Sequence, residues 1–223
     1  MGVGNPAQAV RDIVRVAMTE TKRISIFPLS GALLFPGMHL PLHIFEDRYR
    51  ALINDAMARD RRIGMIQPKT DGDVPELFDI GCVGKIVDIE ALDDGRFNIV
   101  LEGVARFRVV EEIDASTAFR QVRAEIEEDM EIDEVLASTE RAALEIASRK
   151  FAEAQGYQVD WDSIGRLDDM SFVNGIAQIA PFDAASKQAL LEIDGLSNRA
   201  ELIIQLLNFF GRQDGDEGRV TLQ

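Results

Sequence analysis

The sequence contains a single cysteine, Cys82, among its 223 residues. One cysteine cannot form an intrachain disulfide, which is typical of proteins that fold in a reducing compartment, so we expect a cytoplasmic protein. Neither histidine of the chain lies close to Cys82 in the sequence. Because a lone cysteine in an apolar strand is normally inert packing, we interpret Cys82 as a core residue and not as a nucleophile.

Basic residues and long apolar runs are also scarce. The chain has 24 lysines and arginines against 39 aspartates and glutamates, which gives a formal net charge of −15. Proteins that hold phosphate backbones use clustered basic side chains, so this charge argues against nucleic acid and anionic membranes as partners. No run approaches the roughly 18 apolar residues of a bilayer span, and the first residues lack the pattern of an export signal, so we expect no membrane anchor.

The motifs of common enzymes are missing as well. The sequence lacks the phosphate-binding pattern G-x-x-x-x-G-K-[ST], the G-x-S-x-G elbow, the H-E-x-x-H metal motif and C-x-x-C. Its two histidines, His39 and His43, flank Pro41 on an expected strand, where they would lie roughly 13 Å apart. We therefore expect two partly buried histidines that are hydrogen-bonded to their surroundings, and the sequence predicts no catalytic residue, no metal site and no cofactor.

Several groups of charged residues could carry chemistry, but each has a structural interpretation. Residues 46–50 combine two acids and two arginines, yet a glutamate at a helix start normally serves the helix N-terminus. The acid pairs 93–94 and 168–169 are adjacent residues in a turn and at a helix start, so their side chains diverge. Residues 125–134 hold seven acids and no base but lack the calcium-loop pattern, so we expect a solvated linker there.

What the sequence does contain is an apolar segment interrupted by prolines, residues 26–49. Pro28, Pro36 and Pro41 each lack a backbone N–H and hold φ near −65°, so no helix can run through the segment. Pro36 followed by Gly37 predicts a turn, because proline presets φ and glycine accepts positive φ. The segment is therefore expected to consist of short extended pieces joined by turns.

The residues around this turn predict two extended pieces followed by a helix. Residues 33–35 arrive on one side of the turn, and residues 40–44 leave on the other with apolar residues at every second position. After Phe45 the apolar residues recur at helical spacing. They are Tyr49, Leu52, Ile53 and Ala56.

The pattern of strands continues to residue 128. Further strands are expected at residues 63–67, 81–92, 96–102, 106–110 and 119–126, with a hairpin turn at 93–95. Gly103 interrupts the alternation, which predicts a bulge or a tight bend. Six or so strands with one embedded helix predict a closed or nearly closed antiparallel barrel.

The second half of the chain has a helical period. Helices are expected over residues 135–151 with a stop at Gly156, 172–179 before Pro181, 184–193 with Asp183 as N-cap, and 196–210 before Gly211. The α+β chain is thus divided into an N-terminal extension (1–23) with a candidate helix over 7–18, a β domain (24–128), an all-helical domain (129–211) and a polar tail (212–223).

Three blocks of short motifs follow one another along the chain. They are Phe27-Pro28-Leu29, Phe35-Pro36-Gly37, Leu40-Pro41-Leu42, Ile44-Phe45-Glu46 and Arg48-Tyr49; then residues 81–89, Asp94-Gly95-Arg96 and residues 103–108; and finally residues 187–192 with Arg199. In this order they resemble the N-terminal substrate-binding domain of Lon proteases, and more closely the stand-alone bacterial proteins made of that domain. The third block carries the resemblance less specifically than the first two.

The resemblance implies a PUA-like, six-stranded pseudo-barrel with an embedded helix, followed by a helical bundle, in agreement with the periodicity. In Lon proteases the same region precedes an ATPase module and a protease domain with a Ser-Lys dyad. This sequence ends at Gln223 without a Walker sequence. We therefore expect a non-catalytic module that lacks peptidase and ATPase activity.

The resemblance also implies a binding function. The expected partners are polypeptides, either unfolded or damaged clients or components of a protease. The candidate binding residues are Leu33, Leu34, Phe35 and Met38, because this loop has more apolar surface than a simple turn needs. The same residues could instead fold back into the core.

A second function from another class stays open, because PUA-like barrels include readers of RNA and binders of small molecules. The net charge of −15 argues against RNA. The arginines of the β region are also interleaved with glutamates. They are Arg106, Arg108, Arg120 and Arg123, among Glu111, Glu112 and Glu125.

Overall fold

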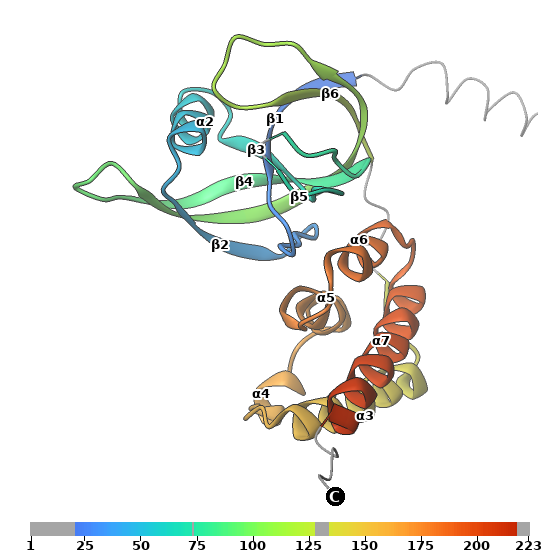
Figure 1. The fold of residues 1–223 in the computed structure, drawn as a ribbon. Helices are drawn as coiled ribbons and strands as arrows, with labels where there is room; N and C mark the ends of the chain where they lie inside the picture. Colours follow the sequence, from blue (N-terminus) through green and yellow to red (C-terminus); the bar gives the residue numbers. More distant parts are fainter. Residues whose placement is uncertain (1–20, 73, 128–133, 218–223) are drawn as a thin grey trace, which may run out of the picture.

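The structure is a computed structural model that describes residues 21–72, 74–127 and 134–217, with side chains described up to residue 211. Its strands are β1 (Thr21–Pro28), β2 (His39–Ile44), β3 (Arg62–Ile66), β4 (Ile80–Ala91), β5 (Phe97–Ile113) and β6 (Gln121–Ile126). Its helices are α2 (Asp47–Met57), α3 (Ser138–Gln155), α4 (Trp161–Ile164), α5 (Asp169–Ile179), α6 (Ala184–Glu192) and α7 (Leu196–Glu217). The strands with α2 form one unit and the other helices gather beside it (Figure 1), which confirms the predicted α+β class.

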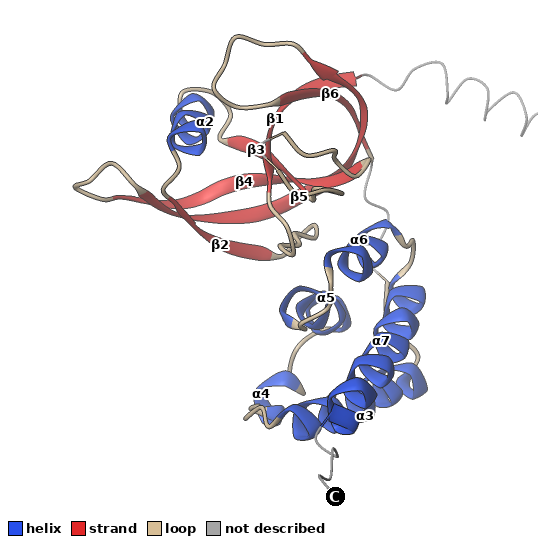
Figure 2. Cartoon of the chain, in the orientation of Figure 1, coloured by secondary structure: helices blue, strands red, loops and turns tan. Residues whose placement is uncertain are grey.

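Five strands close into a ring, because β6 pairs with β5 as well as with β1. The order is β2-β5-β4-β3-β1-β6, so β2 extends the sheet outside the ring through β5 alone (Figure 2). One pair is parallel, with Ile26 opposite Gly64 in β1 and β3, so the prediction of a fully antiparallel barrel is wrong. Parallel strands need a long connection, and here β2 and α2 supply it.

The strand prediction around Gly103 is half right. The bulge is present, because Val83 pairs with Ala105 while Gly84 pairs with Gly103, which leaves Val104 as the extra residue. The two expected strands, however, are one continuous strand of 17 residues, β5. A bulge bends a strand and increases its twist without ending it.

The Pro36-Gly37 turn forms as predicted, but residues 33–35 directly before it do not form the expected strand. Gly37 has φ of 74°, and the amide of Met38 donates to the Phe35 carbonyl at 3.0 Å. The turn is held against β5 at its bulge, since the amide of Gly37 donates to the Gly103 carbonyl and the amide of Gly103 to the Met38 carbonyl, both at 2.9 Å. The loop backbone is thus paired with the bulge residue Gly103 of β5 through a single bridge and not through a regular strand ladder.

Helix α2 covers one opening of the ring with the apolar face that the sequence predicts. Its buried residues are Tyr49, Leu52, Ile53 and Ala56. The ring of Phe27 meets that of Tyr49 edge-on, with 4.1 Å between centroids. This embedded helix therefore contributes to the core of the barrel.

The helical unit follows the predicted stops and caps at several points. Gly156 ends α3 with φ of 70°, and the Asp183 carboxylate accepts the Ser186 amide at 2.7 Å to cap α6. The short helix α4 was not predicted, because four residues show no period. Helix α7 continues past Gly211, at which a Cβ would lie 3.4 Å from the Phe151 ring. A glycine costs only about 1 kcal/mol within a helix, so it does not force an end.

The predicted domain limits stay an interpretation. Strand β1 includes residues 21–23 of the expected extension, and α7 includes residues 212–217 of the expected tail. The proposed boundary near residue 128 and the candidate helix over 7–18 lie outside the described residues.

The loop after β1 joins the two units. Leu33 and Phe35 belong to the core of the helical unit, whereas Leu34 between them belongs to the core of the barrel. Met38 packs against the helical core from the side. The two cores are therefore connected through one short loop.

Arg199 of α7 is the charged centre of this junction. Its side chain is almost fully buried, and its guanidinium lies over the Phe35 ring at 4.8 Å from the centroid. It donates from Nε to the Leu190 carbonyl (2.9 Å), from Nη1 to Asn174 Oδ1 (3.1 Å) and from Nη2 to the Ile193 carbonyl (3.1 Å). The two carbonyls lie at the C-terminal end of α6, where backbone acceptors lack helical partners.

Buried glutamines hold barrel and helices together around this contact. Gln67 Nε2 donates to the carbonyl of Ala184 at 3.1 Å and to Gln188 Oε1 at 3.2 Å, and Gln188 Nε2 donates to the Ile80 carbonyl at 3.0 Å. These bonds join residue pairs more than a hundred positions apart in sequence. Because buried amides are costly when unpaired, they fix the register of the docking.

Lys187 of α6 is buried at the same junction. Its ammonium donates to the carbonyl of Gly31 at 2.8 Å and to that of Gln178 at 3.0 Å, and Gln178 in turn donates to the Leu33 carbonyl at 2.9 Å. Burial lowers the pKa of the Lys187 ammonium below its usual range. The junction thus contains two cations, Lys187 and Arg199, that both donate to oxygens of the backbone.

We expect Phe35→Ala to lower the free energy of unfolding by about 3–5 kcal/mol, because it empties a ring site that is buried among the helices. Urea unfolding followed by circular dichroism measures this. Phe45→Ala is the matched control, since Phe45 is 60% exposed and should change stability by no more than about 0.5 kcal/mol. Equal losses for both variants would contradict the assignment of Phe35 to the core.

We expect Gly103→Ala to cost about 2 kcal/mol or more, because the added Cβ would lie 2.0 Å from the carbonyl oxygen of Phe35. The loop would have to leave the bulge to make room. Gly175→Ala on α5 is the control, since its Cβ has no atom within 4 Å and should stabilise the helix slightly. Thermal unfolding of the two variants compares them, and a neutral Gly103→Ala would disprove the close approach.

Lys187 predicts a pH dependence of stability. The pKa of Lys187 in the folded protein lies below the ordinary 10.5. Between the folded pKa and 10.5 the unfolded chain therefore binds more protons than the folded one, so the free energy of unfolding should rise as the pH increases towards 10.5. The difference in unfolding free energy between the wild type and Lys187→Met isolates this contribution, because other groups cancel. A difference that stays constant with pH would refute it.

Candidate functional site

The structure buries most of the loop that the sequence predicts as a binding surface. Leu33, Leu34 and Phe35 are 2%, 1% and 1% exposed, and Met38 is half-buried against the helical core. The expectation of surplus apolar surface at this loop is therefore wrong, and the alternative that these residues fold back as core describes their position. Peptide binding by the loop stays a prediction, and of its four residues only Met38 keeps part of its side chain accessible in this arrangement.

The two histidines and the cysteine, which were considered for metal or nucleophilic chemistry, have structural surroundings. His43 Nδ1 lies 2.7 Å from Asn98 Oδ1, and its Nε2 lies 3.2 Å from Arg96 Nη1. His39 and His43 are both exposed on β2, so the expectation of partly buried histidines is wrong. Cys82 is buried in the barrel core, as expected. Among the described residues, no group of three or more His, Cys, Asp or Glu is placed to hold a metal ion.

The charged groups singled out in the sequence form local contacts. Glu46 precedes α2 without capping it and pairs with Arg48 at 2.8 Å, while Asp47 pairs with Arg50 at 2.9 Å. Asp168 caps α5 by accepting the Ser171 amide, and this bond lowers the pKa of its carboxyl. Asp94 binds Arg96 within the β4–β5 turn, which lowers its pKa too.

The arginines on β5, on β6 and directly before β6 contact carboxylates, as their interleaving with glutamates suggests. Arg120 and Arg123 pair with Glu112 and Glu111, each at 2.7 Å. Arg106 and Arg108 share Glu127, and Arg106 also reaches Asp194 of the helical unit at 2.7 Å. These strands therefore present paired charges and not a continuous basic face.

The first open surface is the free edge of β2. This strand pairs with β5 along its full length, from His39 opposite Glu102 to Ile44 opposite Phe97, and no other described strand pairs with its second side. The outward backbone groups of an edge strand can pair with an added strand. Pro41 lies in the middle of this edge, where a missing N–H is tolerated.

An exposed aromatic residue ends the edge strand. Phe45 is 60% exposed, and its ring stacks with that of His43 at a centroid distance of 6.2 Å. The alternation of residues 40–44 contains a signal for the exposure of Phe45. Leu40, Leu42 and Ile44 point towards the barrel core, so the next residue, Phe45, falls on the opposite, solvent-facing side. In the sequence, Phe45 stands out only as part of the motif Ile44-Phe45-Glu46.

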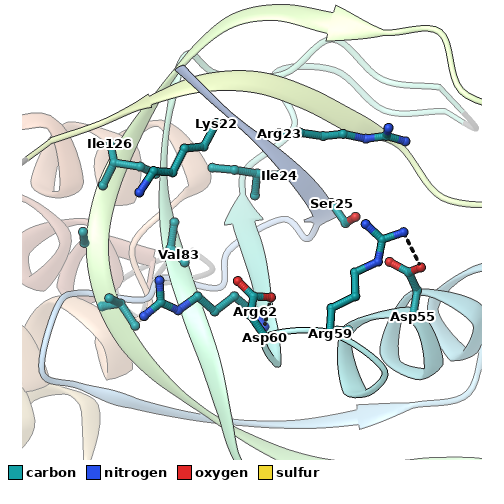
Figure 3. A pocket seen from close by; sticks show the side chains of 13 residues that line it. Lys22, Arg23, Ile24, Ser25, Asp55, Arg59, Asp60, Arg62, Val83 and Ile126 are labelled. Carbon is teal, nitrogen blue, oxygen red and sulfur yellow. Dashed lines mark hydrogen bonds and ion pairs between the residues drawn. The ribbon is translucent and has the colours of Figure 1, made fainter. Parts of the chain in front are cut away.

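The second open surface is a cavity of about 260 Å³ at one end of the barrel. Strand β1 pairs with β6 over Thr21–Ser25 but with β3 only from Ile26 onward, so β1 and β3 part at this end. Figure 3 shows the side chains around the opening. The lining residues are Lys22, Arg23, Ile24, Ser25, Asp55, Ala56, Arg59, Asp60, Arg62, Val83, Val104, Ala105 and Ile126.

The lining of this cavity is apolar at its base and mainly basic at its rim. It has four basic and two acidic side chains in a chain of net charge −15. Arg59 is engaged by Asp55 at 3.0 Å, and Arg23 Nε donates to the amide oxygen of Gln121. No sequence motif indicated this cavity, because its residues come from six separate elements.

A scan of protein families matches residues 23–208 to the substrate-binding domain of ATP-dependent protease La (LON). Lon protease 2 of Myxococcus xanthus is 29% identical over 198 residues, and Lon protease 1 of Syntrophobacter fumaroxidans is 30% identical over 192 residues. These matches cover 83% and 82% of this chain, but each covers only 23% of the relative. The chain thus spans less than a quarter of the length of these relatives.

Solved structures show the same fold. The Lon N-terminal domain protein from Xanthomonas campestris matches with a TM-score of 0.62 and 22% identity, over 84% of this chain and 98% of that one. The N-terminal domain of the Mycobacterium avium complex Lon protease matches with a TM-score of 0.60 and 20% identity, over the same shares of the two chains.

None of the helices in the described part of the chain has the length and apolar character of a membrane span. By its family match, the chain belongs to the LON substrate-binding domain family.

Proposed function

We propose that this chain is a non-catalytic module that binds extended segments of unfolded or damaged polypeptide, with the edge of β2 as the docking strand. The observation that carries this proposal is the free side of β2 within a domain of a substrate-binding family. Strand addition binds a peptide mainly through its backbone. Such binding tolerates many sequences, which suits a module that meets unfolded clients.

Phe45 gives this edge an apolar anchor. Aromatic side chains dominate the energy of many interfaces because they bury a large area with few rotatable bonds. Phe45 lies at the end of β2 beside the exposed ring of His43, so a strand added along the edge would reach both rings. The position of Phe45 therefore favours a peptide with an apolar side chain opposite it.

The negative charge of the protein favours some polypeptide clients over others. A shallow cavity of about 330 Å³ lies on the sheet beside the edge, and its lining includes His43 of β2 with Asp88 and Glu90 of β4. The whole chain carries −15. Complementary charge speeds encounter and excludes like-charged partners, so neutral or basic segments should bind better than acidic ones.

The relatives support a proposal for the partners and the setting of this chain. The matching full-length proteins are named Lon proteases, and we propose that this chain acts in the control of proteolysis, on polypeptide clients or with protease components, in the cytoplasm. It should neither hydrolyse ATP nor cleave casein. RNA binding is the weaker candidate, since the arginines of β5 and β6 are paired with carboxylates.

We expect Phe45→Ser to weaken binding of an extended peptide about tenfold or more, because the variant loses the aromatic anchor. The probe is a fluorescein-labelled peptide of ten alternating valine and lysine residues with an amidated C-terminus. Fluorescence anisotropy measures its affinity. The same peptide methylated on alternate backbone nitrogens should bind poorly, because it cannot pair with the β2 edge.

Ile146→Ser is the matched control for this experiment. Ile146 lies on α3 and is 68% exposed, so the variant removes exposed apolar surface far along the chain from β2. It should bind the peptide as the wild type does. Equal binding by Phe45→Ser and the wild type, or equal binding of the methylated peptide, would refute the β2 edge as the site.

A further inference from the structure

We infer that the cavity at the end of the barrel binds a carboxylate carried on a short aliphatic group, and specifically the C-terminal residue of a polypeptide. This cavity, between β1, β3 and the end of α2, shares no residue with the β2 edge. The inference adds a second, chemically different site and does not depend on strand addition at β2.

Two cations at the rim are available to an anion. Among the described residues, the ammonium of Lys22 and the guanidinium of Arg62 have no hydrogen bond or ion pair, whereas Arg59 is held by Asp55. In Figure 3 the Lys22 and Arg62 side chains extend to the same side of the cavity, on either side of Val83. A carboxylate placed between them would gain charge-assisted hydrogen bonds, and arginine can bind both of its oxygens.

The base of the cavity fits an aliphatic side chain. Ile24 and Val83 form buried parts of the lining, and the half-buried Ile126 and the bulge residue Val104 add apolar surface. The volume of about 260 Å³ lies below the range of pockets for drug-sized ligands. The site therefore fits one terminal residue with its carboxylate better than a larger ligand.

The acids at the rim limit the charge of the ligand. Asp60 accepts the backbone amide of Arg62 at 3.3 Å and places a carboxyl group beside the opening. Asp55, although paired, adds a second carboxylate. A multiply charged phosphate group would be repelled by these groups, and by the chain as a whole, more strongly than a single carboxylate.

The experiment compares two forms of one peptide, a fluorescein-labelled chain of ten alternating lysine and valine residues that ends in valine. One form has a free C-terminal carboxylate and the other is amidated. Anisotropy should give about tenfold tighter binding for the free acid, and Arg62→Gln and Lys22→Gln should each reduce this ratio. Both residues are exposed, so these variants should keep the fold, which circular dichroism checks.

Lys85→Gln is the charge-matched control. Lys85 is exposed on β4 directly opposite Arg62 in the sheet, but it does not line the cavity. It should leave the ratio of acid to amide affinity unchanged. Equal affinities for acid and amide, or an equal effect of Lys85→Gln and Arg62→Gln, would overturn the inference.

Two further measurements separate this site from its alternatives. The Phe45→Ser variant should retain the preference for the free acid, so failure of the β2 edge and failure of the cavity are distinguishable. Calorimetric titration with N-acetylvaline tests a free small carboxylate. Binding of N-acetylvaline as tight as that of the peptide acid would overturn the assignment to polypeptide ends.

Discussion

The contact between the Arg199 guanidinium and the Phe35 ring holds the molecule in its observed arrangement. Arg199 belongs to the last helix and Phe35 to the loop after the first strand, so this contact joins the two ends of the described chain. Around it the guanidinium donates to oxygens on α5 and at the end of α6. A buried charge is tolerated only when such partners are present, so the loop and three helices have to assemble together.

This junction decides which surfaces remain open. The apolar loop around Phe35 connects the barrel core with the helical core. Buried glutamines and Lys187 form hydrogen bonds with the polar groups around this loop. Both sites that we propose for recognition lie on the barrel. They are the free side of β2 and the gap where β1 parts from β3.

The two openings suit different parts of one extended polypeptide. The β2 edge would bind the backbone and apolar side chains of a peptide. This protein is strongly acidic as a whole, whereas the cavity has mainly cations at its rim. A segment with a neutral or basic body and a free carboxylate at its end would satisfy both. Each site has its own charge and its own residues, so the two can be altered independently.

The sequence by itself determined the class of the fold, the buried face of α2, the Pro36-Gly37 turn, the Gly103 bulge and the stop at Gly156, because each depends on local backbone chemistry or on periodicity. It also carried the family through its motif order. Only the tertiary structure decided that Phe35 is core and not surface, that β1 pairs in parallel with β3, and that Lys22 and Arg62 share a cavity. These outcomes depend on contacts between residues far apart in sequence, for which the local pattern contains no signal.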